Sequence, residues 1–114
     1  MSELFEDLCN LDRLVHSPPR LAILTALLGC ERADFMFLLN VTGLSRGNLS
    51  TQLRKLEEAR LIRIRKSFKN RRPRTEASLT ALGRRRIEEH WRELERLRED
   101  AEGWRAAQAS PSAG

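Results

Sequence analysis

The chain has 114 residues, of which 40% are hydrophobic and 32% charged, and its net charge at pH 7 is +5. This length suits one domain with a single small core, and the composition excludes a disordered chain. No apolar run reaches the roughly 20 residues of a membrane-spanning helix, and the acidic N-terminus lacks a signal-peptide pattern. We therefore expect a cytoplasmic protein that does not enter a membrane.

The positive charge is concentrated in one third of the sequence. Residues 45–86 carry 14 Lys and Arg against 3 acidic residues, a net charge of +11, whereas residues 1–44 and 87–114 each carry −3. A run of charge most often marks a solvated surface, but a cationic segment of this density also attracts polyanions. The local structure of the segment decides between the two.

No pattern in the sequence supports catalysis or a bound metal. Cys9 and Cys30 are far apart and lack the spacing of a metal or redox motif, so we interpret them as small buried residues. His16 and His90 are isolated, and the sequence contains no Ser/His/Asp set and no Gly-rich phosphate loop. We expect no enzyme activity, no metal and no cofactor.

The first part of the chain predicts three helices. Apolar residues at helical spacing predict a helix over residues 3–15, which Ser17-Pro18-Pro19 ends. A second helix, residues 20–28, is apolar over more than half its circumference and should be buried, with the preceding serine as its N-cap. A short third helix, residues 35–39, leads into a tight turn at residues 40–43.

A fourth helix is predicted from Ser45 to Ala59. Ser45 suits the N-cap position, and Leu49, Leu53 and Leu56 fall within a narrow arc at about 100° per residue, so they should face the core. The opposite face is small and polar at first and cationic further along. Two helices joined by a short Gly-containing turn form a helix-turn-helix arrangement.

The hydrophobic period then changes from 3.6 to 2, which predicts a β-hairpin. Ile62, Ile64 and Phe68 share one face and are expected in the core. We expect a turn at residues 70–73, whose proline delays the return strand, residues 74–79. Outward cations can protect a sheet edge from aggregation, but the number at this tip exceeds that need: Lys66, Lys69, Arg71, Arg72 and Arg74.

A long amphipathic helix follows from Ala81 to Trp104, with Thr80 as its N-cap, and residues 106–114 are expected to be a disordered tail. At roughly 36 Å the helix is longer than the core beneath it, so part of its apolar stripe would be exposed. A homodimer would cover that stripe, and the alternative is a helix that packs only on its own core. The expected dimer interface comprises residues of the first and last helices: Leu4, Leu8, Leu11, Ile87, Trp91, Leu94, Leu97 and Trp104.

This order of elements resembles the winged helix-turn-helix transcriptional regulators, in the broad group that includes the ArsR and MarR families. The resemblance covers about residues 11–98 and rests on four stretches: residues 11–24, 42–59, 71–75 and 79–84. Two features depart from the group. Arg60 stands where such sequences usually carry Gly, and the Cys-bearing motif of metal-sensing members is absent.

The resemblance implies a mainly α fold with a small antiparallel β-hairpin, called the wing, and with N- and C-terminal dimerisation helices. It implies one DNA-binding domain over residues 1–105, with its core at 11–82 and a dimer helix at 81–104. The implied partners are a second copy of the chain and double-stranded DNA at a promoter.

In a helix-turn-helix protein the second helix enters the major groove with its N-terminal residues at base edges. The candidates for base contacts are Ser45, Arg46, Asn48, Ser50, Thr51 and Gln52. Arg46 suits guanine, and Asn48 or Gln52 suits adenine. The candidates for phosphate or minor-groove contacts are Arg54, Lys55, Lys69, Asn70, Arg71, Arg72 and Arg74. The alternative for each is a solvated surface residue.

We therefore expect a dimeric, sequence-specific repressor that binds a pseudo-palindromic site with its recognition helices about one DNA turn, roughly 34 Å, apart. A repressor is favoured over an activator because no activation surface is evident. The alternative function is a winged-helix assembly module that binds an acidic protein through its cations. The sequence specifies neither the operator nor the regulated genes, and it contains no pattern for a small-molecule effector.

Overall fold

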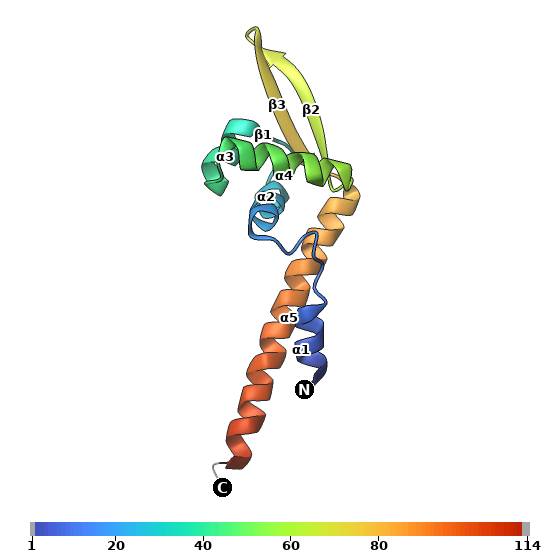
Figure 1. Cartoon of the computed structure of the whole chain (residues 1–114), viewed down its shortest axis with the longest axis vertical. Coiled ribbons are helices and arrows are strands. Elements are labelled where there is room, and N and C mark those ends of the chain that lie inside the picture. Colours follow the sequence, from blue (N-terminus) through green and yellow to red (C-terminus); the bar gives the residue numbers. More distant parts are fainter. Residues whose placement is uncertain (1, 113–114) are drawn as a thin grey trace.

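A computed structural model describes the backbone of residues 2–112 and the side chains of residues 6–108. The elements in chain order are α1 (Ser2–Cys9), α2 (Pro18–Leu28), β1 (Ala33–Asp34), α3 (Phe35–Thr42), α4 (Arg46–Glu58), β2 (Ile62–Lys69), β3 (Arg72–Leu79) and α5 (Ala81–Ser112). The molecule measures 73 × 23 × 23 Å, because α5 extends far beyond the other elements with α1 beside it (Figure 1). None of the described helices is long and apolar enough to cross a membrane.

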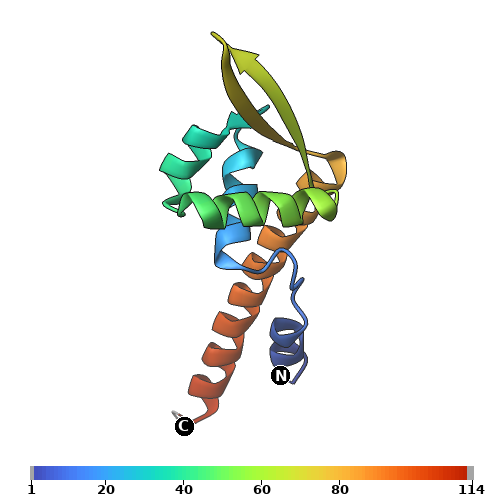
Figure 2. The ribbon, with the colours of Figure 1, turned by 45° about the horizontal axis from the view of Figure 1, so that its top comes forward.

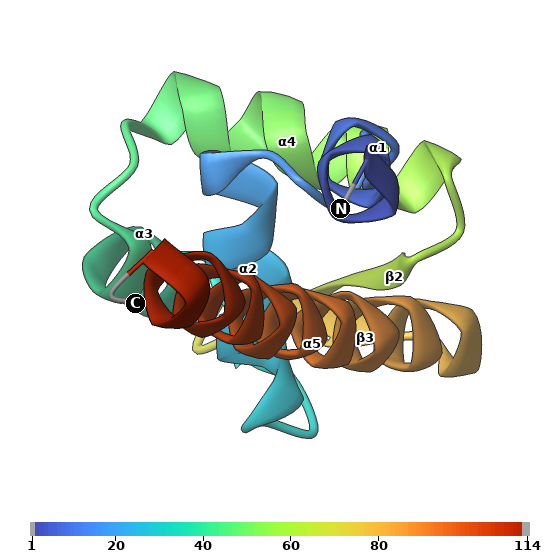
Figure 3. The same ribbon diagram turned by 90° about the horizontal axis from the view of Figure 1, so that it is seen from below.

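The core lies where α2, α3, α4 and the sheet meet the first turns of α5. Seen along the long axis, α2 lies between α4 and α5 (Figure 3), which explains why so much of its circumference is apolar. The predicted inward face of α4 is confirmed, since its three leucines are buried. The principal buried residues are Val15, Ile23, Leu24, Leu27, Leu38, Leu49, Leu53, Leu56, Leu61, Ile62, Ala77 and Ile87.

The side chains at the helix starts explain where most helices begin. Ser45 Oγ accepts a hydrogen bond from the Asn48 N–H at 3.1 Å, and Thr80 Oγ1 accepts one from the Gly83 N–H at 2.9 Å, so these two of the three predicted N-caps are confirmed. Ser17 occupies the N-cap position of α2 but its side chain makes no capping hydrogen bond.

Two helix ends differ from the prediction. The helix predicted over residues 3–15 ends at Cys9, because the Asp12 carboxylate accepts the N–H groups of Leu14 and Val15 and stabilises a turn instead. Residues 10–17 therefore form a linker between α1 and α2. Helix α3 continues through the turn predicted at residues 40–43 and ends only at Gly43, whose φ of +70° is left-handed.

The sheet has the strand order β1-β3-β2 and is antiparallel. Strand β1 was not predicted, because its two residues carry no local pattern and form a strand only by pairing with Ala77 and Glu76. The turn between β2 and β3 contains only Asn70 and Arg71, so the predicted four-residue turn is wrong at its second half. Pro73 lies within β3 opposite Phe68, beyond the part that β1 covers, where its missing N–H costs no bond to β1.

Phe68 does not belong to the core, although its alternation with Ile62 and Ile64 predicted it. Its side chain is 77% exposed, whereas Ile62 is 2% exposed and Ile64 is half-buried. The hairpin extends past the helices (Figure 2), so no element covers the apolar side of β2 near its tip.

Helix α5 is longer than predicted. It continues past Trp104 to Ser112, where we expected a disordered tail, because Ala106, Ala107 and Gln108 all have high helix propensity. The last two tail residues lie outside the described residues.

Candidate nucleic-acid interface

Exposed cations lie along α4 and the hairpin. Both elements lie at the end of the molecule opposite the free end of α5 (Figures 1 and 2). Ser45 and the leucines of α4 fix the rotation of that helix, and the alternation of the strands turns every second residue outward. The exposed cations are Arg46, Arg54 and Lys55 on α4 and Arg63, Arg65, Lys66, Lys69, Arg71 and Arg72 on the hairpin.

The protein does not neutralise these cations. Within the described part of the chain, none of them lies in an ion pair, whereas the ion-paired arginines of α5 are Arg84, Arg86, Arg96 and Arg98. Arg74 is the exception on the hairpin, because its guanidinium lies 3.4 Å from Asp34 Oδ2 and 3.8 Å from Glu76 Oε2. The positive charge of α4 and the hairpin tip is therefore left for an external anion.

The candidates for base contacts lie on the first two turns of α4, but several already have partners. The Ser45 hydroxyl is used as the N-cap, and Gln52 Nε2 donates a hydrogen bond to Asn48 Oδ1 at 3.0 Å. Arg46 and Ser50 are exposed. Thr51 is half-buried, as are Asn48 and Gln52.

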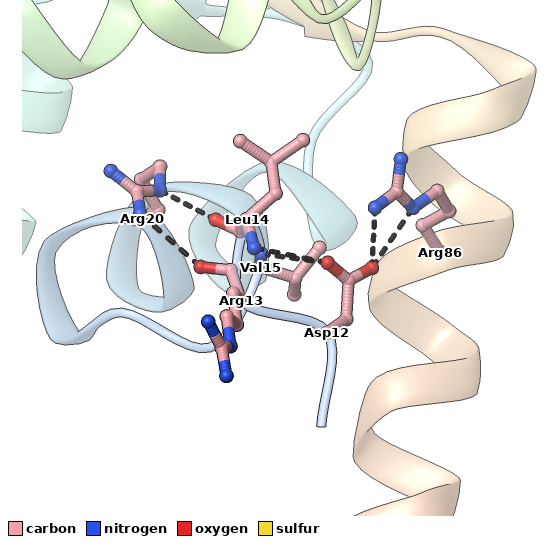
Figure 4. Close-up of polar contacts among 6 residues, drawn as sticks. All are labelled: Asp12, Arg13, Leu14, Val15, Arg20 and Arg86. Carbon is pink, nitrogen blue, oxygen red and sulfur yellow. Dashed lines mark hydrogen bonds and ion pairs between the residues drawn. The ribbon is translucent and has the colours of Figure 1, made fainter. Parts of the chain in front are cut away.

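Arg20 joins this group, although the sequence did not indicate it. Its Nη1 donates to Gln52 Oε1 at 3.0 Å. Its Nε donates to the carbonyl oxygen of Leu14, and its Nη2 donates to that of Arg13 at 3.4 Å (Figure 4). In the sequence Arg20 is only a cation near the start of α2. The contact with α4 crosses 32 positions of sequence, and no local pattern could have revealed it.

The linker also contacts α5. Arg86 Nε donates to Asp12 Oδ2 at 3.0 Å, and Nη2 of the same guanidinium bonds the same oxygen (Figure 4). His16 Nδ1 and His90 Nε2 are 3.0 Å apart, so the two histidines that are isolated in the sequence are adjacent in the fold. His90 is only 4% exposed.

These contacts shift two pKa values. Burial opposes the charged form of Asp12, but the hydrogen bonds from Arg86, Val15 and Leu14 outweigh it and hold the pKa of this carboxyl below its ordinary value. Burial, followed by the nearby His16, lowers the pKa of His90, against the smaller opposing effects of Asp12 and Glu93.

The predicted dimer residues differ in how far their own chain buries them. Ile87 and Leu97 are 0% and 2% exposed within one chain, so predicting them as dimer contacts was wrong, because the chain itself buries both. Leu8 and Trp91 are 43% and 39% exposed. Leu11, Leu94 and Trp104 are half-buried, and the side chain of Leu4 lies outside the described residues.

Cysteines and metal-ligating groups contribute no further site in the described part of the chain. Cys9 is exposed and Cys30 half-buried, and both are free thiols, so the expectation that both are buried was wrong for Cys9. Among the described residues no three His, Cys, Asp or Glu side chains lie together as a metal site would require.

Comparison with known families decides what this arrangement is. Residues 20–98 match the family model described as a winged helix DNA-binding domain. The chain belongs to the winged helix DNA-binding family. The β2–β3 hairpin is its wing, as the resemblance implied.

Solved structures agree with the family. The chain is similar to a transcriptional regulator homologue protein from Pyrococcus horikoshii OT3, with a TM-score of 0.77 and 29% identity over 89% of this chain and 98% of that one. It shares its fold with a MarR-family regulator from Silicibacter pomeroyi (TM-score 0.62, 17% identity, 98% and 77% covered). It also shares its fold with the transcriptional repressor CouR bound to a 23-mer DNA duplex (TM-score 0.65, 22% identity, 98% and 83% covered).

A search of curated proteins finds no significant match. The matched family and the similar structures are transcriptional regulators rather than enzymes, and they support a DNA-binding regulator.

Proposed function

We propose that this winged helix protein is a homodimeric, sequence-specific repressor that binds double-stranded DNA. The observation that carries the proposal is the placement of uncompensated charge. Among the described residues, nine exposed cations without ion pairs lie on α4 and the wing, the two elements that a winged helix presents to DNA. On α5, by contrast, four of the seven arginines are paired within the chain: Arg84, Arg86, Arg96 and Arg98.

Helix α4 would enter the major groove. Arg46, Gly47 and Ser50 are exposed at its N-terminal end, and because Gly47 has no side chain the helix can approach the base edges closely there. Arg54 and Lys55 follow one to two turns later on the exposed side, where they suit phosphates on the groove wall.

The wing would contact the DNA backbone or the minor groove. Lys69, Asn70, Arg71 and Arg72 form its exposed tip. Arg74 is the weakest of the predicted wing contacts, because Asp34 and Glu76 already attract its guanidinium.

The dimer would form through α1 and the free part of α5. These two helices lie side by side away from the core (Figure 1), and Leu8 and Trp91 remain exposed on them. A twofold axis through this region would present two recognition helices to one pseudo-palindromic site. Occupancy of a promoter by such a dimer would exclude polymerase.

A salt titration of DNA binding tests the proposal. The double variant Arg71→Ala/Arg72→Ala should bind duplex DNA more weakly and with a shallower dependence on salt, because the slope falls by about one for each phosphate that the protein no longer neutralises. The matched control is Arg92→Ala/Arg105→Ala, which removes the same charge from exposed positions of α5 and should leave the slope unchanged. Equal salt slopes for the wing variant and the wild type would show that the wing does not contact DNA. Failure of the wild type to bind any duplex at low salt would refute the proposed function.

A further inference from the structure

Three polar side chains form a chain of hydrogen bonds that ends on the recognition helix. Arg20 Nη1 donates to Gln52 Oε1, and Gln52 Nε2 donates to Asn48 Oδ1, each at 3.0 Å. We propose that Arg20 is a positioning residue for base recognition: it fixes which atom of the Asn48 amide faces the DNA. The inference rests on the proposed function and adds to it the kind of base that Asn48 selects.

The donor and acceptor at each step of this series of hydrogen bonds follow from the chemistry of Arg20. A guanidinium has only hydrogen-bond donors, so the atom of Gln52 that contacts Arg20 must be the carbonyl oxygen Oε1. The NH₂ group of Gln52 then points toward Asn48, and the atom of Asn48 that meets it must be the acceptor Oδ1. Reversing either amide would place two donors or two acceptors against each other.

The Arg20 guanidinium cannot reorient with Gln52, because further hydrogen bonds fix its position. Its other nitrogens donate to the backbone carbonyls of Leu14 and Arg13 in the linker (Figure 4). The linker in turn is bonded to α5 through the ion pair of Asp12 with Arg86. The amide orientation on α4 is therefore imposed by groups outside α4.

The consequence concerns the base that Asn48 can select. A bidentate contact with adenine needs Oδ1 and Nδ2 to face the base together. With Oδ1 directed toward Gln52, one turn further along α4, the NH₂ group is the part left to meet a base. An NH₂ donor suits the major-groove acceptors, which are O6 and N7 of guanine, O4 of thymine and N7 of adenine. In adenine, however, N7 lies beside the N6 donor, which finds no acceptor once Oδ1 is directed toward Gln52. Asn48 should thus prefer guanine or thymine to adenine, which replaces the expectation of adenine from the residue type alone.

Two substitutions change this series of hydrogen bonds in different ways. Arg20→Ala removes the donor that orients Gln52, so both orientations of the Asn48 amide become available. Gln52→Glu keeps a partner for Arg20 but offers only acceptors, so Asn48 must turn its NH₂ group toward residue 52 and present Oδ1 to the DNA. Because Oδ1 accepts, this variant should favour a base with a major-groove donor, which is cytosine through N4 or adenine through N6.

The test is selection of bound sites from a random duplex library with the wild type and with four variants: Arg20→Ala, Gln52→Glu, Asn48→Ala and Arg20→Ala/Asn48→Ala. Asn48→Ala identifies the base pair that Asn48 reads. At that pair the wild type should select guanine or thymine, and Arg20→Ala should reduce the preference by about fivefold or more. Gln52→Glu should shift the preference toward cytosine or adenine. The double variant Arg20→Ala/Asn48→Ala should show the same base preference as Asn48→Ala alone, because Arg20 affects that preference only through the Asn48 amide.

Arg13→Ala is the matched control, since only the backbone carbonyl of Arg13 contacts Arg20, and it should keep the wild-type preference. Thermal unfolding identifies any variant that does not fold, and Gln52→Glu then carries the test in place of Arg20→Ala. The inference is overturned if Arg20→Ala weakens binding to all sequences equally, if Gln52→Glu leaves the preferred base unchanged, or if Asn48→Ala alters no position. In each of these cases the wild type still selects a site, whereas a wild type that selects none refutes the proposed function itself.

Discussion

Arg71 stands in a backbone conformation that favours glycine. The turn of the wing has φ of 53° at Asn70 and 66° at Arg71, and Asn-Gly is the preferred pair for two-residue turns with positive φ at both positions. Asn70 fits this preference, but an arginine in the left-handed region costs about 1 kcal/mol. A contact between Arg71 and the DNA backbone would explain why a cation stands at the tip despite this cost.

The substitution Arg71→Gly should therefore separate stability from function. We expect the free energy of unfolding to rise by up to about 1 kcal/mol, less the extra freedom that glycine gives the unfolded chain, while the affinity for DNA falls. Chemical denaturation and a binding titration measure the two effects. Arg71→Lys, which keeps both the charge and the strained conformation, should stay near the wild type in both. A gain of stability with unchanged affinity would show that Arg71 does not contact DNA.

His90 makes stability depend on pH. Its pKa is lowered in the folded protein, mainly by burial and then by His16, so the unfolded chain binds more protons than the folded one below the ordinary histidine pKa of about 6.5. Neutral His90 therefore contributes its full stabilisation of the fold above about pH 6.5. That contribution is lost as the pH falls from about 6.5 to below the pKa of His90 in the folded protein. Asp12, whose pKa is also lowered, loses its contribution only below about pH 4.

Melting temperatures between pH 8 and pH 5 test this account of His90. We expect the wild type to melt at a lower temperature at pH 5 than at pH 8. His90→Gln keeps a polar group opposite His16 but does not titrate, so its melting temperature should fall less over the same range. An equal fall in both proteins would assign the pH dependence to other groups.

At the scale of elements, α4 could be predicted almost to the residue because its determinants are local. Ser45 caps it and the spacing of its leucines orients it. The strands of the wing were also predicted, since alternation is local. Phe68 shows where alternation fails: it specifies a face, but whether another element covers that face depends on how far the hairpin extends.

The remaining errors concern contacts between distant segments. Strand β1 exists only through pairing with β3, more than 40 positions later. Ile87 and Leu97 belong to an apolar stripe whose period was predicted correctly, but the period does not say whether the same chain or a second copy covers it. The link from Arg20 to Gln52 has no sequence signal at all.

The junction between β3 and α5 depends on one glycine. A Cβ at Gly83 would lie 1.8 Å from the carbonyl oxygen of Leu61, so the first turn of α5 packs directly against the backbone that follows α4. This contact sets the direction in which α5 leaves the domain.

Two substitutions of glycine by alanine in α5 should therefore have opposite effects. Gly83→Ala should destabilise the protein by about 1–3 kcal/mol, because backbone atoms must separate. Gly103→Ala meets no atom within 4 Å and should stabilise the protein by about 0.5–1 kcal/mol through helix propensity. Chemical denaturation compares the two, and a stable Gly83→Ala variant would contradict the close contact with Leu61.

In the whole molecule, α5 is the longest element, and most of its described side chains are exposed. Its 32 residues would span roughly 48 Å at 1.5 Å per residue, and most of that length lies outside the domain core (Figure 1). A second copy of the chain would cover this part and place the two recognition helices on one face.

Leu8→Glu tests the dimer directly. Leu8 is 43% exposed, so the substitution should spare the fold of one chain, while it places a charge in an apolar interface. Sedimentation at micromolar concentration should give about twice the 13.2 kDa chain mass for the wild type and a lower mass for Leu8→Glu. Asn40→Glu, at an exposed position of α3, should remain dimeric. A monomeric wild type would remove the dimer from the proposed function.

We expect α4 and the wing of each copy in a dimer to recognise one specific DNA sequence. Selection of bound duplexes from a random-sequence library by the wild-type protein checks this expectation. One motif should be enriched, with two inverted half-sites whose centres lie about 10 base pairs apart. Recovery of no enriched sequence, together with no shifted band for any duplex at low salt, would contradict it.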